Sequence, residues 1–238
     1  MQPTTSHQMM GYDRSSTMFS PDGRLLQVEY AKKSVRQAAT SLGIMCKDGV
    51  LVLADKRILE KLMIGDSIDK VFQVDDHIAA CATGFLMDAR VLIEQAQLIA
   101  QQHRVTYDSS IDVASLVKSI ANMKQYFTQY GGARPFGVSF LFAGVDEHGP
   151  QLYLTDVTGI YVQYKATAIG EMEPQLKDIL DAEYKDSLTV DQGLKLGISA
   201  LKRAFGKDFD ISRVDGAFVD LQGQFHRYSL DELKKATK

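Results

Sequence analysis

The chain has 238 residues, of which 45% are hydrophobic and 24% are charged, and its formal net charge is −3 at pH 7. This composition is ordinary for a globular protein, and the small negative charge gives no electrostatic basis for binding nucleic acid. No apolar run reaches the length that crosses a bilayer, so we expect neither nucleic acid nor a membrane among the partners. The histidines are scattered without ligand spacing, which predicts no metal site, and no motif calls for a cofactor.

Two further features indicate the cellular compartment. Residues 1–11 are polar and contain no charged segment followed by an apolar core, which argues against a secretory signal. Cys46 and Cys81 both fall in apolar, strand-like runs, and we interpret them as buried free thiols of a reducing compartment. The sequence therefore predicts a cytoplasmic protein.

The first predicted element is a helix that follows a polar lead. Ser20 is a good N-cap and Pro21 suits the first helical position, so we expect a helix over residues 20–37. Its apolar positions share one face, which must lie on the chain's own domain or on a neighbouring chain. These positions are Leu25, Val28, Ala31 and Val35.

After this helix, pairs of strands alternate with pairs of helices. Asp-Gly between apolar alternations predicts a hairpin over residues 40–55, and a second hairpin is expected over residues 70–83. Apolar residues at helical spacing predict helices over 88–103, 112–130, 174–184 and 190–203 and a short C-terminal helix capped by Ser229. Further strands are expected over 136–146, 151–156, 160–164, 166–169, 213–221 and 224–228.

This order of elements favours one α+β domain with mainly antiparallel sheets. Two sets of strands and two sequential pairs of amphipathic helices fit a four-layer α-β-β-α sandwich, in which helix layers cover two central sheets. No linker interrupts the pattern, so we expect residues 1–238 to form a single domain whose sandwich spans residues 40–238.

Several common catalytic motifs are missing from the sequence. No phosphate-binding glycine loop follows a strand and opens a helix, and no serine-centred nucleophile elbow occurs. Asp75 and Asp76 are adjacent carboxylates on a predicted tight turn, and we interpret them as solvated turn residues rather than an acid/base pair.

The start of the first strand resembles the opening of N-terminal-nucleophile hydrolases. In those enzymes a processed N-terminal Thr begins the first strand, an acid closes the second, and a lysine lowers the pKa of the nucleophile, whose own α-amine acts as base. Asp55 and Lys70 are present here, but the register puts Ala39 at the nucleophile position. We therefore expect the fold without its nucleophile, because Thr40 or Ser41 would acquire a free amine only by cleavage inside the chain.

Several blocks match one family in the same order along the chain. They are residues 12–31, Thr83-Gly84 with Asp88-Ala89-Arg90, and residues 129–132, 134–139 and 164–170. Together they resemble α-type subunits of the proteasome, and most closely those of archaea, over essentially the whole chain. One departure is Glu171-Met172-Glu173, where that family more often carries small or polar residues.

This resemblance implies a non-catalytic α subunit of a 20S core particle. Seven α subunits would form each outer ring, β subunits would carry the proteolytic threonines, and the α ring would gate the entry of unfolded protein substrates. A regulatory ATPase or other activator would dock through its C-terminal residues, in ubiquitin-independent or tag-dependent degradation. The alternatives are an active hydrolase that uses Thr40 or Ser41 after internal cleavage, and a free-standing binding module.

The resemblance also implies a gate at the N-terminus. Residues 1–11 match a mobile gate tail, and their polar composition suits low intrinsic order. The residues that match the cluster holding the gate open, by pairing between neighbouring subunits, are Tyr12, Asp13, Pro21 and Tyr30.

A docking pocket is implied in the same way. Lys70 matches the pocket lysine that receives the C-terminal carboxylate of an activator, and Gly84 would let the activator's backbone approach closely. The helix predicted over residues 20–37 would bury its apolar face partly against the next subunit, and Asp55 would be a structural remnant. No residue of this chain is expected to be catalytic.

Overall fold

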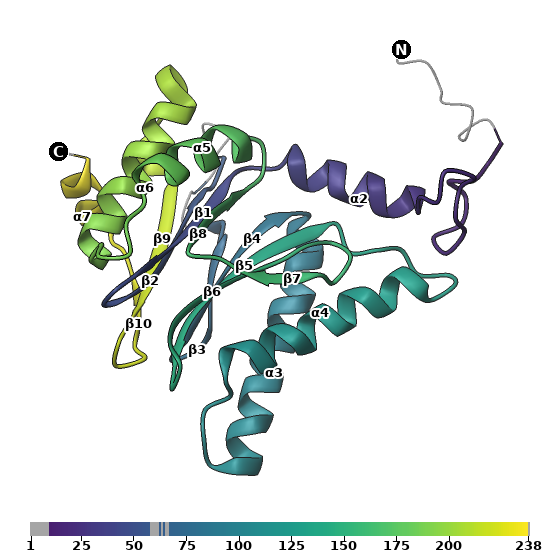
Figure 1. Ribbon diagram of the computed structural model, residues 1–238, viewed down its shortest axis with the longest axis horizontal. Helices are drawn as coiled ribbons and strands as arrows, with labels where there is room; N and C mark the ends of the chain where they lie inside the picture. The colour runs from purple at the N-terminus through teal and green to yellow at the C-terminus, as the bar shows by residue number, and fades with distance from the viewer. Residues whose placement is uncertain (1–9, 58–61, 63, 65–66, 238) are drawn as a thin grey trace.

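The computed structural model describes residues 10–57, 62, 64 and 67–237, and its centre is a pair of antiparallel sheets packed face to face (Figure 1). The strands of the first sheet are β1 (Ser41–Cys46), β2 (Gly49–Asp55), β8 (Ala166–Ile169), β9 (Val214–Asp220) and β10 (Phe225–Arg227). Those of the second are β3 (Val71–Asp75), β4 (Ile78–Gly84), β5 (Val138–Asp146), β6 (Gly149–Thr155) and β7 (Tyr161–Gln163). Their orders are β10-β9-β2-β1-β8 and β3-β4-β5-β6-β7.

Helices cover the outer faces of both sheets, which confirms the predicted α+β sandwich (Figure 1). The second sheet carries α3 (Leu86–Tyr107) and α4 (Val113–Gln129). The first sheet carries α5 (Glu173–Glu183), α6 (Val190–Phe205) and α7 (Leu230–Ala236), and Ser229 caps α7 as predicted. A further helix, α2 (Leu26–Arg36), leads from the start of β1 toward an N-terminal segment that projects from the sandwich.

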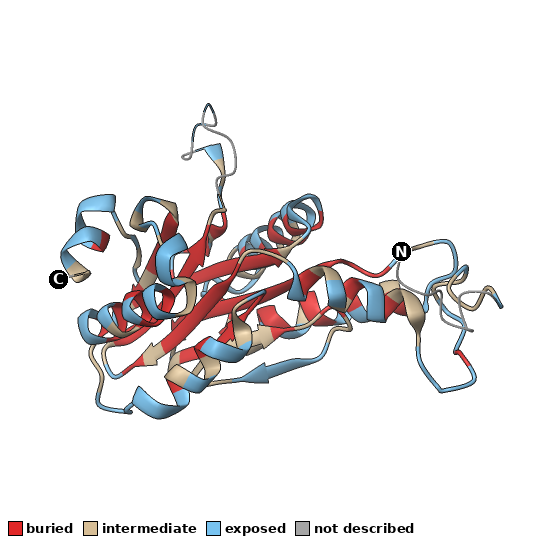
Figure 2. Cartoon of the chain, turned by 90° about the horizontal axis from the view of Figure 1, so that it is seen from above, coloured by how far each residue is buried: buried red, intermediate tan, exposed pale blue. Residues whose placement is uncertain are grey.

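Buried apolar residues fill the three spaces between the four layers of helices and sheets. Val52 and Leu141 belong to the layer between the two sheets, Leu116 lies between α4 and the second sheet, and Ile198 lies between α6 and the first. Figure 2 shows the buried residues concentrated on the strands and on the inward faces of the helices. Strand β2 is buried at every position because it has a sheet on one face and helices on the other. Burial of this apolar surface is the main force that holds the layers together.

The helix α2 begins later than the sequence predicted. Ser20 does not cap a helix, because it begins a tight turn in which the Gly23 N–H donates to the Ser20 carbonyl (2.8 Å) and the Ser20 N–H donates to the Arg24 carbonyl (2.8 Å). Gly23 takes a φ of +74°, which its missing side chain permits, and Pro21 presets the second position of the turn. The helix begins at Leu26. Ser, Pro, Asp and Gly favour turns as well as caps, and here the turn prevails.

The apolar face of α2 is covered by the chain itself. Val28, Ala31 and Val35 are buried in one cluster with Val157, which precedes β7. The predicted apolar face is thus buried within this chain, and Tyr30 is exposed on the opposite face of α2.

The turn between β3 and β4 also differs from its prediction. The hairpin is present, but the Asp75 side chain is only 2% exposed and is not solvated. Arg104, on α3, places Nη2 2.7 Å from Asp75 Oδ1 and Nη1 3.1 Å from Asp76 Oδ2. The two carboxylates therefore fasten a helix to the turn.

Both cysteines are buried free thiols, as predicted. Burial raises the pKa of Cys46 to about 12 and that of Cys81 to about 11, so both stay protonated at neutral pH. Across the described residues, no helix is both long and apolar enough to cross a membrane.

One buried residue of α4 carries an amine. Lys124 is fully buried, and its Nζ donates to Thr155 Oγ1 (2.9 Å) and to the Thr155 carbonyl (3.3 Å). The same Nζ lies 5.2 Å from the centroid of the Phe140 ring. Burial lowers the pKa of Lys124 to about 7, and the charge of Asp156 opposes the shift. The folded chain therefore releases the Lys124 proton far more readily than the unfolded chain does.

We expect Lys124→Met to stabilise the chain near neutral pH. The unfolded lysine keeps a pKa of about 10.4, so the unfolded chain binds more protons between about pH 7 and pH 10, and stability rises with pH across that interval. The destabilisation caused by the buried Lys124 charge is greatest below about pH 7, where the substitution should raise the free energy of unfolding by about 2–4 kcal/mol. This gain in stability should vanish toward about pH 10. Urea unfolding at the two pH values measures this. Lys118→Met, on an exposed position of α4, is the matched control, and a Lys124→Met chain that is less stable near neutral pH would contradict the expectation.

Candidate functional site

The residues that the hydrolase resemblance singled out meet at the start of β1. Lys70, directly before β3, is only 4% exposed, and its Nζ donates to the Ala39 carbonyl at 2.7 Å. Thr83 Oγ1 lies 2.8 Å from Ser41 Oγ, and 3.4 Å from the Ala39 carbonyl. An ammonium group and two hydroxyls therefore surround position 39, whose side chain is a methyl group.

Asp55, the acid that closes β2, is part of an ion pair. Its side chain is buried and accepts from Arg213 through Nη2 (2.7 Å) and Nε (3.0 Å), and it also accepts from the Arg57 N–H (3.1 Å). This two-pronged contact ties the end of β2 to the segment that enters β9. Asp55 is thus placed to stabilise the fold, in agreement with its interpretation as a structural remnant.

Thr40 and Ser41, the alternative nucleophiles, are both buried. Thr40 Oγ1 accepts from the Met172 N–H at 3.0 Å, and the Thr40 carbonyl accepts from the Asp55 N–H at 2.9 Å. A free amine at either residue would require a break in the chain where α2 joins β1. The structure therefore holds both hydroxyls in internal hydrogen bonds.

The environment of Lys70 is electrostatically mixed. Burial lowers the pKa of the Lys70 ammonium, and the charge of Arg57 lowers it further, whereas Cys81, Asp55 and Asp215 act in the opposite direction. A desolvated ammonium gains more from pairing with a carboxylate than a solvated one does. Lys70 thus lies among both cationic and acidic groups at the start of β1.

Gly84 ends β4 and is required there by the chain itself. Its φ is +126°, and a Cβ built there would lie 2.1 Å from the Gly137 carbonyl oxygen. The close approach of two backbones, where β4 pairs with the start of β5, excludes any side chain. The predicted role of Gly84 toward an activator stays a prediction.

The predicted gate cluster is only partly assembled within one chain. The Tyr30 hydroxyl donates to Asp13 Oδ2 at 3.2 Å, and Gln27 Nε2 donates to the Asp13 carbonyl at 2.5 Å. Pro21 lies on the exposed turn before α2, and Tyr12 is partly buried next to Asp13. Of the predicted tail, residues 1–9 lie outside the described residues.

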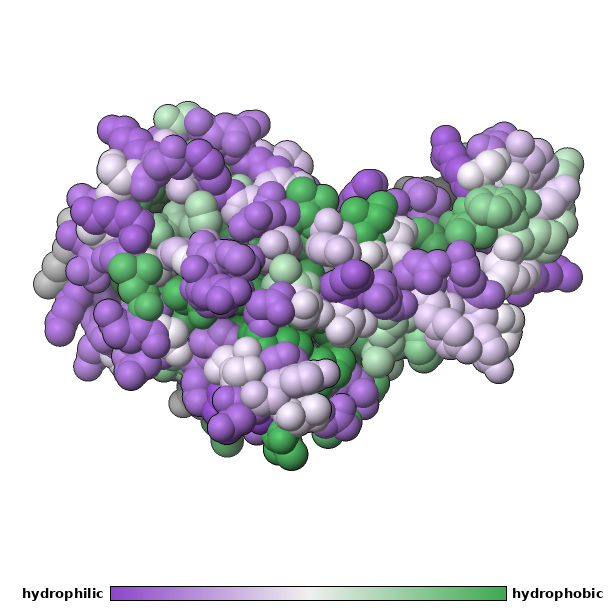
Figure 3. Space-filling model, turned by 60° about the horizontal axis from the view of Figure 1, so that its bottom comes forward, coloured by the Kyte–Doolittle hydropathy of each residue, from purple (hydrophilic) through white to green (hydrophobic). Residues whose placement is uncertain are grey.

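The segment before α2 exposes hydrophobic side chains. Met10 is 69% exposed, Met18 43% and Phe19 64%, and Figure 3 shows this segment as a separate lobe with hydrophobic surface. Phe19 bridges to Leu25 across the turn, which fixes the base of the lobe. Contiguous exposed hydrophobic surface is common where proteins contact other molecules.

An ion pair that the sequence did not predict completes the site. Arg57 pairs through Nη2 with the Glu171 carboxylate and donates through Nη1 to the Gln37 carbonyl (3.2 Å). The only available signal in the sequence was the departure of residues 171–173 from the family pattern. Nothing local in the sequence connects that departure to Arg57.

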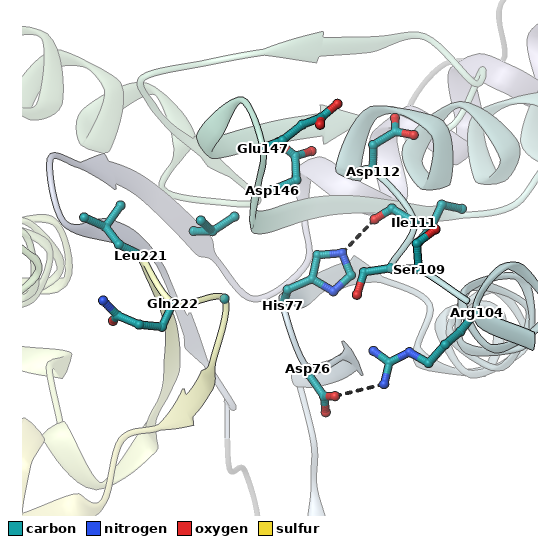
Figure 4. Close-up of a pocket in the computed structure, with 13 residues that line it drawn as sticks. Asp76, His77, Arg104, Ser109, Ile111, Asp112, Asp146, Glu147, Leu221 and Gln222 are labelled. Atoms are coloured by element: carbon teal, nitrogen blue, oxygen red, sulfur yellow. Dashed lines mark hydrogen bonds and ion pairs between the residues drawn. The ribbon is translucent and has the colours of Figure 1, made fainter. Parts of the chain in front are cut away.

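A large cavity, of about 660 Å³, lies at the other end of the sandwich (Figure 4). It is bounded by the turns that follow β3, β5 and β9 and by the loop between α3 and α4. His77 Nε2 lies 2.7 Å from the Ile111 carbonyl oxygen there, and Arg104 pairs with Asp76. The predicted site residues do not line this cavity, and within residues 10–57, 62, 64 and 67–237 no His, Cys, Asp or Glu group is arranged to hold a metal ion.

Two facing sheets between helix layers, with an acid and a lysine beside position 39, define an α+β sandwich of the N-terminal-nucleophile-hydrolase type. Within that class, the chain belongs to the proteasome subunit family. The profile of that family matches residues 35–219, and the profile of the N-terminal signature of its A-type subunits matches residues 12–33. These matches confirm the resemblance found in the sequence.

Curated relatives, each named as the alpha subunit of a proteasome, match nearly the whole chain. The relative from Methanocaldococcus jannaschii is 48% identical over 225 residues, which cover 94% of this chain and 86% of the relative. The relative from Archaeoglobus fulgidus is 46% identical over 226 residues, which cover 94% and 92%. The relative from Methanosarcina barkeri is 46% identical over 223 residues, which cover 94% and 90%.

If Asp55 has a structural role, Asp55→Asn should destabilise the chain. Loss of the charge leaves the Arg213 guanidinium without its buried partner, which we expect to lower the free energy of unfolding by about 2–4 kcal/mol. Asp186→Asn is the matched control, because Asp186 pairs with Lys165 on the surface and its loss should have no measurable effect. Equal stability of the Asp55→Asn and unsubstituted chains in urea would contradict the assignment.

Proposed function

We propose that this chain is a non-catalytic α subunit of a 20S proteasome core particle. It forms the heptameric outer rings, gates the entry of substrates and docks activators. The observation that carries the proposal is that the chain has the α-type N-terminal signature of the family while Ala39 occupies the nucleophile position. The complex is a threonine-type endopeptidase, and its catalytic residues belong to the β subunits.

The partners follow from this assignment. They are other α subunits in the ring, β subunits below it, a regulatory ATPase or other activator above it, and unfolded protein substrates. The exposed hydrophobic lobe at Met18 and Phe19 supports a contact with a neighbouring α subunit. The two buried free thiols agree with a reducing, cytoplasmic location.

The gate is assigned to the N-terminal segment. The hydrogen bond between Tyr30 and Asp13 joins this segment to the exposed face of α2, so a neighbouring subunit on that face would lie close to the start of the tail. We assign residues 1–11 to the tail, and Tyr12, Asp13, Pro21 and Tyr30 to the open-state cluster.

The docking pocket is assigned to Lys70 and Gly84. A buried ammonium at the start of β3 suits a C-terminal carboxylate, because a charge-assisted hydrogen bond is strong where water is excluded. Gly84, at the end of β4, is assigned to the pocket from the family resemblance alone.

We expect Lys70→Ala to abolish stimulation by an activator without preventing assembly. Loss of a charge-assisted hydrogen bond to the activator should weaken docking by roughly tenfold or more. Stimulated peptide hydrolysis by the assembled α-β particle measures this, with Lys47→Ala, an exposed lysine on the β1–β2 turn, as the control. Normal stimulation of the Lys70→Ala particle would refute the pocket assignment.

Deletion of residues 1–11 should raise basal hydrolysis of small peptides by the assembled particle. If the tail narrows the entrance, its removal lets peptides enter without an activator, and the effect should be larger for long peptides than for tripeptides. Comparison of the two peptide lengths with the full-length and shortened chains measures this. Unchanged basal hydrolysis would show that the tail is not a gate.

A further inference from the structure

Three successive carbonyl groups at the end of α2 bind three separate parts of the chain. Arg57 Nη1 donates to the carbonyl of residue 37 at 3.2 Å, and the Glu171 N–H donates to that of residue 38 at 3.0 Å. Lys70 Nζ donates to the carbonyl of residue 39 at 2.7 Å. Two cations and one carboxylate-bearing residue therefore surround the bend at residues 37–39, where α2 leads into β1.

The carboxylate of Glu171 already neutralises one of these cations. It forms an ion pair with Arg57 Nη2, and the two side chains are 47% and 33% exposed. Lys70 Nζ, in contrast, bonds a neutral carbonyl oxygen. At this bend Arg57 is thus paired with a carboxylate near the surface, whereas Lys70 is bound only to a neutral, weaker acceptor.

The positions of Arg57 and Glu171 are fixed by their own backbones. Arg57 takes a φ of +46°, an unusual value for a residue with a side chain, and its N–H is held by Asp55 Oδ1. Glu171 is held on both sides: Gly170 has a φ of +106° and packs against residues 38–40, and the Met172 N–H binds Thr40 Oγ1. These backbone contacts hold both residues beside the bend.

We propose that this bend is a carboxylate-binding site with two cations. In the free protein Glu171 pairs with Arg57, and an incoming C-terminal carboxylate displaces Glu171. The inference rests on the proposed docking role of Lys70. It adds Arg57 as a second cationic partner of the ligand and Glu171 as a competitor within the chain.

Physical chemistry favours such an exchange. A half-exposed ion pair contributes little stability, so it opens at small cost. A guanidinium group binds a carboxylate through two parallel hydrogen bonds, whereas an ammonium group acts as a point charge, so Arg57 and Lys70 offer complementary contacts. The two cations donate to carbonyls only two residues apart, which places them on the same bend.

The test uses the assembled α-β particle and a fluorescein-labelled heptapeptide that ends in Ala-Ala with a free α-carboxylate. Fluorescence anisotropy gives the dissociation constant, and the same peptide with a C-terminal amide measures binding that does not depend on the carboxylate. We expect Glu171→Gln to tighten binding of the free acid by about three- to tenfold at low salt. The gain should shrink at high salt and be absent for the amide.

Glu173→Gln is the matched control, because Glu173 lies two residues away and pairs with Lys177 at 2.7 Å with similar exposure. The Arg57→Met and Glu171→Gln substitutions are also combined, and the gain from Glu171→Gln should be lost in the Arg57→Met background. Thermal melting of each particle reports whether the fold is kept, and Arg57→Lys provides a variant that retains the charge.

The outcomes separate this inference from the docking assignment. Binding that requires Lys70 and the free carboxylate but is unchanged by Glu171→Gln overturns the competitor role and leaves the docking pocket intact. An equal gain with and without Arg57 overturns the two-cation site. Binding of the free acid that survives Lys70→Ala, or no carboxylate-dependent binding by any variant, refutes the pocket and with it this inference.

Discussion

The hydrogen bond from the Lys70 ammonium to the Ala39 carbonyl is the contact on which the rest of the site depends. It fastens the segment before β1 to the start of β3, and so joins the two sheets at the position where a nucleophile hydrolase would need a free chain terminus. The chain instead runs on through α2, and Thr40 and Ser41 are enclosed by internal hydrogen bonds. Function resides in particular residues rather than in the fold, so the same type of fold can carry different functions.

This arrangement places Lys70, Gly84 and position 39 at one end of the sandwich. The extension before β1 packs its apolar face on its own domain and turns its polar face, including Tyr30, outward. Lys70 and the ion pair between Arg57 and Glu171 adjoin the junction of α2 with β1, and the hydrophobic lobe lies at the opposite end of α2. The large cavity at the opposite end of the sandwich holds ion pairs that fasten a turn to α3, and none of the predicted site residues lines it.

Local patterns in the sequence predicted most of the fold, because they report short-range physics. Asp48-Gly49 marked the first hairpin, and apolar spacing located the long helices and the buried face of α2. The errors arose where two local signals compete, or where a residue distant in the sequence determines the burial or pairing of a side chain. Ser20 suits a cap and a turn equally, and Asp75 is buried because Arg104 reaches it from α3. Lys70 was found through resemblance, whereas the pairing of Arg57 with Glu171 spans 114 positions and could not be inferred from either segment alone.

The central claim is that the chain forms rings and does not cut peptides itself. Native mass spectrometry of the full-length chain, produced without other subunits, tests this claim most directly. We expect complexes of seven or fourteen chains, each of which keeps every residue before Thr40. A monomer, or a product that begins at Thr40 or Ser41, would contradict the claim.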